Sequence, residues 1–248
     1  MNRFFVGSKQ VKENIIEITG KDVKHIKNVL RLKPKDTVEI ISEGKHYTCQ
    51  ISNIFSDKVE VLILDSYNGK NESPIDIVLF QGIAKGSKMD LIIQKGTEIG
   101  IKEFYPLVTK RTVVKIKDSK KEKNKINRWS NIAEEASKQS KRDIIPLVNN
   151  VVGFDKMIDI LKEEKNIIIP YEMENSYGLK KALKKIRGER VNLIIGPEGG
   201  FEKEEIQALK DIGGQVITLG NRILRTETAG IVTASIILYE LGDLGVIM

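Results

Sequence analysis

The sequence predicts an α/β domain with a mostly parallel sheet, preceded by a small β-barrel. In residues 1 to about 68, short apolar or alternating runs are separated by turn residues, which is typical of several short strands. From Ile75 onward, apolar runs alternate with helix-like periodicity, which is typical of a parallel sheet covered by helices. We expect domains at 1–70 and 74–248, joined within the polar, turn-rich segment 66–74.

The N-terminal part contains four runs that we expect to be strands, at 15–18, 38–41, 46–55 and 59–64. One helix is expected at 22–30, with Ile26, Val29 and Leu30 on its buried side. Pro34 ends it, because proline disfavours the helical conformation of the preceding residue.

The C-terminal part is expected to alternate strands and helices. Strands are expected at 75–80, 104–108, 167–169, 191–195 and 216–219, and helices at 87–100, 125–142, 155–163, 177–187, 202–212 and 227–241. Ser87 with Asp90 is a candidate capping box, Gly100 a candidate helix stop, and Thr226 a natural N-cap. The last helix is apolar nearly all round, so it is buried within the chain or packs against a second subunit.

Composition limits the class of protein. The 248 residues include 41 Lys and Arg against 34 Asp and Glu, a formal net charge of +7, which suggests a polyanionic partner. The single cysteine, Cys49, excludes an internal disulfide and a multi-cysteine metal site, and fits a reducing compartment. No apolar run approaches the ~20 residues of a membrane helix, and the N-terminus has no signal-peptide core. We therefore expect a soluble cytoplasmic protein with no metal and no membrane association.

The basic surplus is concentrated in residues 108–142. This stretch holds twelve Lys and Arg and four Asp and Glu, so its net charge is 12 − 4 = +8, more than that of the whole chain. Such a run is either a solvated face or a nucleic-acid contact, and the residues alone leave both open.

A first glycine loop lies at 194–201, where an apolar run stops at Gly196-Pro197-Glu198-Gly199-Gly200 and a charged helix follows. The glycines would let a ligand touch the main chain. Glu198, Glu202, Glu204 and Glu205 would repel a phosphate at this helix start. The loop therefore suits a ligand with little negative charge or one that carries a cation.

A second glycine loop lies at 219–230 and again joins a strand to a helix. Gly220-Asn221 supplies the turn. We expect Ile223 and Leu224 to be buried, which would hold Arg222 and Arg225 in place beside them. Loops that follow the carboxyl ends of strands are where open α/β sheets bind ligands, so the pair of loops is a candidate site.

The two loop sequences together resemble the RsmE family, the 16S rRNA uracil-N3 methyltransferases of the SPOUT superfamily. The resemblance extends to Arg3-Phe4-Phe5 and to residues 25–36, 95–100 and 135–142, and covers essentially the whole chain. Two positions depart from the pattern: Lys35 stands where the family often has glycine, and Glu202 where Ser or Thr usually caps a helix.

The resemblance implies a PUA-like β-barrel that helps to hold RNA, followed by a SPOUT domain with a deep trefoil knot that binds S-adenosyl-L-methionine. It also implies a homodimer with the final helix in the interface, and methylation of N3 of one uridine in the 16S rRNA of the small ribosomal subunit. A SPOUT enzyme with another acceptor, such as a ribose 2′-OH or guanine N1 in tRNA, and a non-catalytic RNA-binding assembly factor remain alternatives. A nucleotide hydrolase is disfavoured because no phosphate-binding loop is present.

The same resemblance implies the site residues. Cofactor-binding residues would be Tyr171, Glu172, Ile195, Gly196, Glu198, Gly199, Gly200, Leu219, Gly220, Ile223, Leu224 and Thr226. From the chemistry of the reaction, we expect Arg222 or Arg225 to stabilise negative charge on the uracil carbonyls. The candidates for taking the N3 proton are Glu198, Glu172, Glu227 and water. RNA contacts are expected from Arg3, His25, Arg31, Lys138 and Arg142.

Overall fold

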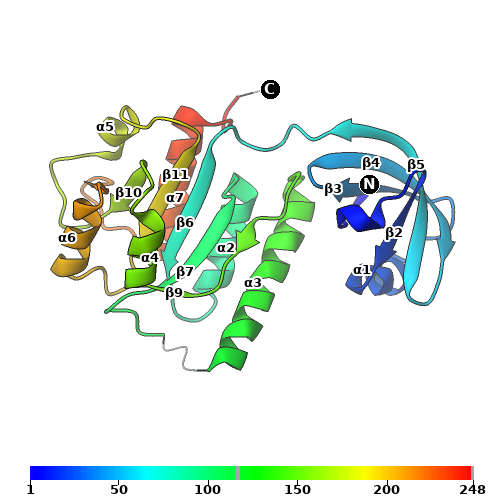
Figure 1. Cartoon of the computed structure of the whole chain (residues 1–248), viewed down its shortest axis with the longest axis horizontal. Helices are drawn as coiled ribbons and strands as arrows, with labels where there is room; N and C mark the ends of the chain where they lie inside the picture. Colours follow the sequence, from blue (N-terminus) through cyan, green and yellow to red (C-terminus); the bar gives the residue numbers. More distant parts are fainter. Residues whose placement is uncertain (115–117, 247–248) are drawn as a thin grey trace. The chain divides into compact units, whose positions relative to one another are not determined.

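The computed structural model describes residues 1–114 and 118–246, and its chain divides into two compact units. The first unit contains Met1–Glu72 together with the short segment Lys141–Ile144, and the second contains Ser73–Ser140 and Ile145–Met248. Figure 1 shows the elements in chain order. The chain thus leaves the first unit inside the polar segment 66–74 and returns to it briefly after the longest helix. Nothing in the sequence had suggested this return.

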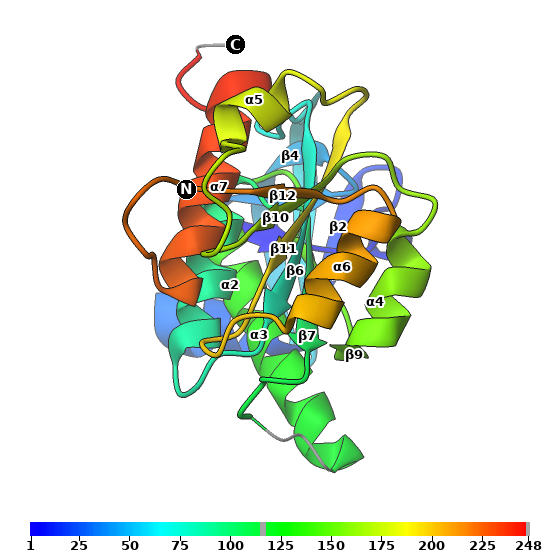
Figure 2. The same cartoon turned by 90° about the vertical axis from the view of Figure 1, so that its left-hand side faces the viewer.

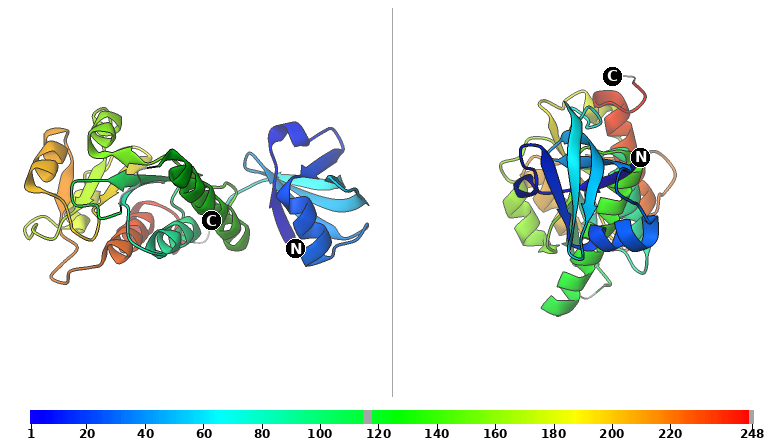
Figure 3. Two further views of the ribbon diagram at one scale, coloured as in Figure 1. Left: turned by 90° about the horizontal axis from the view of Figure 1, so that it is seen from below. Right: turned by 90° about the vertical axis from the view of Figure 1, so that its right-hand side faces the viewer.

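The first unit is a five-stranded sheet in the order β1-β3-β4-β5-β2. β1 (Asn2–Phe5) runs parallel to β3 (Thr37–Ser42), whereas β3, β4 (Lys45–Ile54), β5 (Lys58–Asn68) and β2 (Ile15–Thr19) pair antiparallel. A short 3-10 helix, η1 (Ser8–Gln10), follows β1. The strands curl around an apolar core (Figure 3) that includes Phe4, Ile16, Val38, Cys49 and Val61. Burial raises the pKa of the Cys49 thiol to about 12, which makes it an unreactive core residue.

The helix expected at 22–30 is present, but in two forms. α1 (Lys21–Lys24) continues directly into a π-helix, η2 (His25–Leu30), which ends at Arg31 in the left-handed conformation with φ 52°. Only Ile26 of the expected apolar stripe is fully buried, and Val29 is 66% exposed. The prediction for Val29 is wrong because a π-helix turns less per residue than the α-helix assumed for the stripe.

The second unit is built on a parallel sheet in the order β12-β10-β11-β6-β7-β8, with β9 also pairing with β7. Its strands are β6 (Asp76–Gly82), β7 (Glu103–Val108), β8 (Leu147–Val148), β9 (Val152–Gly153), β10 (Ile167–Pro170), β11 (Arg190–Ile195) and β12 (Gln215–Ile217). The five strands expected from the sequence are present. β1, β8 and β9 were not expected from the sequence.

Helices cover both faces of this sheet (Figure 2), with α2, α5 and α7 on one face and α4 and α6 on the other. Their bounds are α2 (Lys88–Ile99), α3 (Ser119–Ser140), α4 (Phe154–Leu161), α5 (Leu179–Leu183), α6 (Lys203–Asp211) and α7 (Thr226–Leu241). α3 packs against α2. Within the described part of the chain, no helix combines the length and apolar character needed to cross a membrane.

The helix ends differ in part from the sequence prediction. Gly100 ends α2 in the left-handed conformation, as expected. Ser87 stands at the start of α2 but makes no side-chain capping bond, and Asp90 pairs instead with Arg128, so the predicted capping box is wrong. Glu202 caps α6 reciprocally with Glu205, whose carboxylate accepts the Glu202 N–H at 2.8 Å.

Candidate functional site

The loops that follow β10, β11 and β12 meet at one end of the parallel sheet and line a cavity of about 610 Å³. This volume lies within the usual range for small-molecule sites. The lining includes all the residues expected at the cofactor site: Tyr171, Glu172, Ile195, Gly196, Glu198, Gly199, Gly200, Leu219, Gly220, Ile223, Leu224 and Thr226. Arg222 and Arg225 line it too, so the two glycine loops expected to cooperate do come together.

The glycine loop at 196–200 has little room for side chains. Gly200 has φ 71°, donates its N–H to the carbonyl of Pro197 at 2.9 Å, and would place a Cβ 2.8 Å from Glu172 Oε1. A Cβ on Gly199 would lie 3.0 Å from the Cβ of Arg111. The loop therefore needs its glycines both for the backbone turn and for close packing on its neighbours.

A further glycine, Gly82, lies beneath this loop at the end of β6. A Cβ on Gly82 would lie 2.3 Å from the backbone nitrogen of Pro197. The backbone of β6 and the Gly196–Pro197 peptide therefore pass each other in direct contact. The carbonyl of Gly196, in the same peptide, accepts a hydrogen bond from the hydroxyl of Thr226 at 2.6 Å.

This hydroxyl explains a difference from the sequence prediction for α7. Thr226 was expected to cap the helix, but it is the first helical residue and Arg225 occupies the N-cap position. Its hydroxyl bonds across the fold rather than to the backbone of its own helix. The prediction placed the helix start one residue late, which is a typical error for a helix boundary.

Glu198 is held as an anion at the mouth of the cavity. Its Oε1 accepts the N–H of Lys85 at 3.0 Å and the ammonium of Lys88 at 3.2 Å. Burial alone would raise the pKa of Glu198, but these hydrogen bonds and the charge of Lys88 lower it below its usual value. Lys88 also lies 3.5 Å from Glu227 Oε2, so one ammonium balances two carboxylates.

The residues of the loop at 219–225 line the cavity. Ile223 is 85% exposed and Leu224 is half-buried, so the predicted burial of this pair is wrong for Ile223. Gly220, with φ 107°, turns the chain, and its N–H donates to Thr218 Oγ1 at 3.1 Å. Arg222 and Arg225 are exposed, and neither guanidinium bonds to another residue in the described ranges 1–114 and 118–246. Both remain available to a ligand.

The segment after β10 contributes two further carboxylates, Glu172 and Glu174. Hydrogen bonds from the hydroxyl and N–H of Ser176 lower the pKa of Glu174 to about 2. Glu172 is exposed and lies against Gly200. This side of the cavity is therefore acidic, which suits a ligand that carries positive charge.

Some lining residues lie outside the stretches that the sequence singled out, among them Lys88, Glu174, Asn175 and Thr218. Lys88 is the one that a topological argument could have found. It begins the helix after β6, and β6 lies beside β11, whose carboxyl end carries the first glycine loop. Among the residues that the structure describes, no group of His, Cys, Asp and Glu is placed to hold a metal ion.

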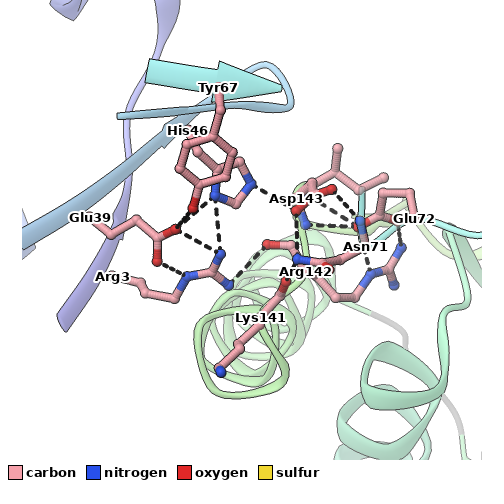
Figure 4. A network of polar contacts seen from close by, with 10 residues as sticks. Arg3, Glu39, His46, Tyr67, Asn71, Glu72, Lys141, Arg142 and Asp143 are labelled. Atoms are coloured by element: carbon pink, nitrogen blue, oxygen red, sulfur yellow. Dashed lines mark hydrogen bonds and ion pairs between the residues drawn. The ribbon is translucent and has the colours of Figure 1, made fainter. Parts of the chain in front are cut away.

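The residues expected to contact RNA lie outside the cavity and differ in accessibility. His25 and Arg31 are exposed at the π-helix, whereas the Lys138 side chain is 13% exposed and pairs with Glu134 and Glu135. Arg3 and Arg142 belong to a buried polar network in the first unit (Figure 4), where they pair with Glu39 and Glu72. Direct RNA contact by these five residues stays a prediction, and burial argues against it for Arg3 and Arg142.

The basic stretch 108–142 is only partly described by the structure. Lys115 and Lys117 lie outside the described residues. The lysines around the start of α3, namely Lys120, Lys121, Lys123 and Lys125, are exposed and belong to the second unit.

Comparison with known proteins assigns the family. A model described as "RNA methyltransferase domain" matches residues 71–238, and one described as "RNA methyltransferase PUA domain" matches residues 18–64. The ribosomal RNA small subunit methyltransferase E of Bacillus subtilis is 36% identical over 97% of this chain and 97% of its own. This chain belongs to the ribosomal RNA small subunit methyltransferase E family.

Solved structures of similar proteins share the fold. A ribosomal RNA small subunit methyltransferase E from Neisseria gonorrhoeae, bound to S-adenosyl methionine, is 29% identical and has a TM-score of 0.86 over 98% of this chain and 99% of its own. A putative methyltransferase from Legionella pneumophila, in complex with the cofactor SAM, is 31% identical and has a TM-score of 0.85 over 97% and 98% of the two chains. The architecture of this chain is thus shared with both of these cofactor-bound proteins.

Proposed function

We propose that this protein is an rRNA methyltransferase that methylates N3 of one specific uridine in the 16S rRNA of the small ribosomal subunit, with S-adenosyl-L-methionine as the methyl donor. One observation carries the proposal: a single cavity gathers every cofactor-site residue that the family resemblance implied, together with two arginines that have no ion-pair partner among the described residues. Membership of the methyltransferase E family supports the choice of rRNA as substrate.

The residues of the cavity fit this cofactor. Its acidic side, with Glu172 and Glu174, suits a ligand that carries a sulfonium and an amino group. Leu219 and the exposed Ile223 offer apolar surface to a purine ring, and the close-packed glycine loop presents main-chain groups to it. When bound, S-adenosylmethionine supplies an electrophilic methyl group.

The remaining chemistry falls to this chain's own side chains. As N3 of the uracil loses its proton, negative charge develops on the two neighbouring carbonyl oxygens. Arg222 and Arg225, which line the cavity without ion-pair partners in the described part of the chain, would stabilise that charge. The glycine loops would position the acceptor in line with the methyl group, and positioning of this kind is a large part of many enzymatic rate enhancements.

The proton acceptor is constrained by the hydrogen bonds of the cavity. Glu198 already accepts bonds from Lys85 and Lys88, and its lowered pKa makes it a weak base. We therefore assign Glu198 the role of holding Lys88 and the loop in place. Water or Glu172, whose carboxylate makes no hydrogen bond to another described residue, would take the N3 proton.

Further expectations from the family belong to the same proposal. We propose a PUA-like barrel for the first unit, a trefoil knot formed by the loops around the cavity, a cytoplasmic location and a homodimer. The direct contact of Gly82 with the Gly196–Pro197 peptide supports a tightly threaded chain at this point. An apolar surface on α7 supports the dimer: Ile236 and Tyr239, three residues apart, are 38% and 68% exposed.

The decisive experiment combines cofactor binding with product analysis. The purified protein is titrated calorimetrically with S-adenosylmethionine and then incubated with the cofactor and small ribosomal subunits that lack the modification. We expect binding, and 3-methyluridine as the sole new nucleoside in the digested 16S rRNA. A 2′-O-methylated nucleoside or 1-methylguanosine would assign another acceptor, and a folded protein that binds no cofactor would be a non-catalytic RNA-binding factor.

A further inference from the structure

Gln81 is a buried side chain that bonds to a residue of the cavity wall but does not line the cavity itself. Gln81, near the carboxyl end of β6, is 1% exposed. Its Nε2 donates one hydrogen to Thr226 Oγ1 at 2.8 Å and the other to the carbonyl of Gly82 at 3.2 Å. Its Oε1 has no hydrogen-bond partner among the described residues. A buried amide oxygen without a hydrogen-bond partner costs free energy. The orientation of this amide is therefore set by the two hydrogen bonds that its nitrogen donates.

The Gln81 amide determines the direction in which the Thr226 hydroxyl donates. A threonine hydroxyl has one hydrogen to give. Because it accepts from Gln81, that hydrogen is directed to the carbonyl of Gly196 at 2.6 Å. The carbonyl of Gly82 fixes the amide orientation, since a rotated amide would place two oxygens against each other. The chain of bonds therefore has one consistent direction, from Gln81 through Thr226 to Gly196.

This series of hydrogen bonds connects three parts of the site that are far apart in sequence. Gln81 belongs to β6, Gly196 to the loop after β11, and Thr226 to the start of α7. The packing around it leaves no slack: a Cβ on Gly230 would lie 3.1 Å from Gln81 Oε1. A substitution that changes the hydrogen-bonding groups of Gln81 but not its volume therefore affects both cofactor loops.

We propose that Gln81 is a positioning residue for the cofactor, an inference that rests on the proposed function. By directing the Thr226 hydroxyl onto Gly196, it holds the loop at 196–200 and the loop at 219–225 at the separation at which both contact one ligand. Gln81 itself does not line the cavity. Its contribution is therefore to cofactor affinity rather than to RNA binding.

The test is the substitution Gln81→Glu, which keeps the shape but removes both amide hydrogens. The Thr226 hydroxyl then turns toward the new carboxylate, and the Gly196 carbonyl loses its donor. We expect the Kd for S-adenosylmethionine to rise about tenfold, as for the loss of one buried hydrogen bond. In steady-state methylation assays the KM for the cofactor rises similarly, while the KM for the ribosomal subunit is unchanged.

Asn192→Asp is the matched control. Asn192 is also 1% exposed and lies on the neighbouring strand β11, but outside the cavity lining. The substitution Asn192→Asp introduces the same buried negative charge. We therefore expect it to lower the melting temperature without raising the Kd for S-adenosylmethionine. Thr226→Val removes the hydroxyl that links Gln81 to Gly196, and Thr226→Ser keeps it. We expect Thr226→Ser to restore most of the affinity lost in Thr226→Val.

The outcomes separate the inference from the function on which it rests. If the wild-type protein does not bind the cofactor, the proposed function fails first. If wild type binds and a folded Gln81→Glu protein binds equally well, the positioning role is overturned. Should Gln81→Glu not fold, the Thr226 pair decides: equal affinity in Thr226→Val and Thr226→Ser would overturn the inference.

Discussion

Asp143 Oδ1 lies 2.7 Å from Nε2 of His46, although 97 residues separate the two along the chain. The other ring nitrogen of His46 lies 2.8 Å from Glu39 Oε1, which also accepts the hydroxyl of Tyr67 at 2.8 Å. The imidazole is 1% exposed and so bridges two carboxylates inside the first unit. This bridge attaches the segment Lys141–Ile144 to the strands of that unit (Figure 4).

Glu39 makes this network sensitive to acid. Burial alone would raise the pKa of its carboxyl, but hydrogen bonds from Arg3, His46 and Tyr67 lower it from 4.5 to about 2. The folded pKa is depressed, so the contribution to stability is complete above about pH 4.5 and is lost as the pH falls toward 2. We expect Glu39→Gln to lower the free energy of unfolding by about 2 kcal/mol at neutral pH, and by much less at pH 3. Urea unfolding at both pH values measures this, and an equal loss for Asp57→Asn, at an exposed loop position, would contradict it.

Arg142 and Lys141 are neighbours with different surroundings. Arg142 is 3% exposed and pairs with Glu72, whereas Lys141 is exposed. Arg142→Met would remove the guanidinium that pairs with Glu72, whose side chain is 27% exposed, so we expect a loss of about 2 kcal/mol in stability, and no significant change for Lys141→Met. Chemical unfolding measures both. A stable Arg142→Met protein with weakened RNA binding would instead support the direct RNA contact expected from the sequence.

Arg225 is expected to act in the methyl-transfer step rather than in cofactor binding. It is exposed at the cavity without an ion-pair partner among the described residues, so its charge is free for the uracil. We expect Arg225→Gln to reduce kcat about a hundredfold, as for other groups that stabilise developing negative charge. The Kd for S-adenosylmethionine stays close to that of wild type. Arg187→Gln is the control, because that guanidinium bonds to the carbonyls of Lys184 and Ile186. A loss of cofactor affinity equal to the loss of kcat would contradict this role.

Gly200 is expected to be intolerant of even one methyl group. Its φ is 71°, and an added Cβ would lie only 2.8 Å from Glu172 Oε1. We therefore expect Gly200→Ala to displace the loop and weaken cofactor binding at least about tenfold. Gly153→Ala is the matched control, because Gly153 has φ −79° and no atom within 4 Å of a Cβ. Calorimetric titration compares the two, and unchanged binding by Gly200→Ala would exclude the loop from the cofactor site.

The exposed part of α7 tests the proposed homodimer. Tyr239 is 68% exposed, and a charge at its position would be buried in a dimer interface. We expect Tyr239→Asp to yield monomers in sedimentation velocity runs at micromolar concentration. Val29→Asp places the same charge on a similarly exposed apolar position, 66% exposed, in the first unit, and leaves the dimer intact. A dimer that survives Tyr239→Asp would place the interface elsewhere.

The regular part of the fold could be predicted from the sequence because its signals are local. Apolar periodicity located most of the long strands and helices of both units to within a few residues, although α3 begins at Ser119, six residues before its expected start. The glycine loops marked the side of the sheet where the cavity lies. The failures are also physical. Thr226 has the residue type of a helix cap, but its hydroxyl is bonded to groups from two other elements. Ile223 is apolar in a loop, which suggested burial, whereas the structure leaves it exposed beside the cavity.

The buried network could not have been predicted from any single stretch. Arg3, His46 and Asp143 are ordinary polar residues in their own surroundings, and only the three-dimensional pairing gives them partners. Family resemblance identified Arg3 and Arg142 as important positions but not their surroundings. A basic residue in an RNA-modifying protein suggests an RNA contact by default, and burial is the observation that argues for a structural role.

The return of Lys141–Ile144 to the first unit has a consequence for how the chain can be divided. A fragment that ends at Glu72 would retain His46 and Asn71 but lose Asp143, to which both are bonded, and would leave Glu72 without Arg142. The segment that completes the polar network of the N-terminal sheet is therefore synthesised only after more than half of the polypeptide. A chimera that carries the N-terminal sheet into another protein would also need the segment Lys141–Ile144. Recombination within the polar segment 66–74 would separate residues that depend on one another.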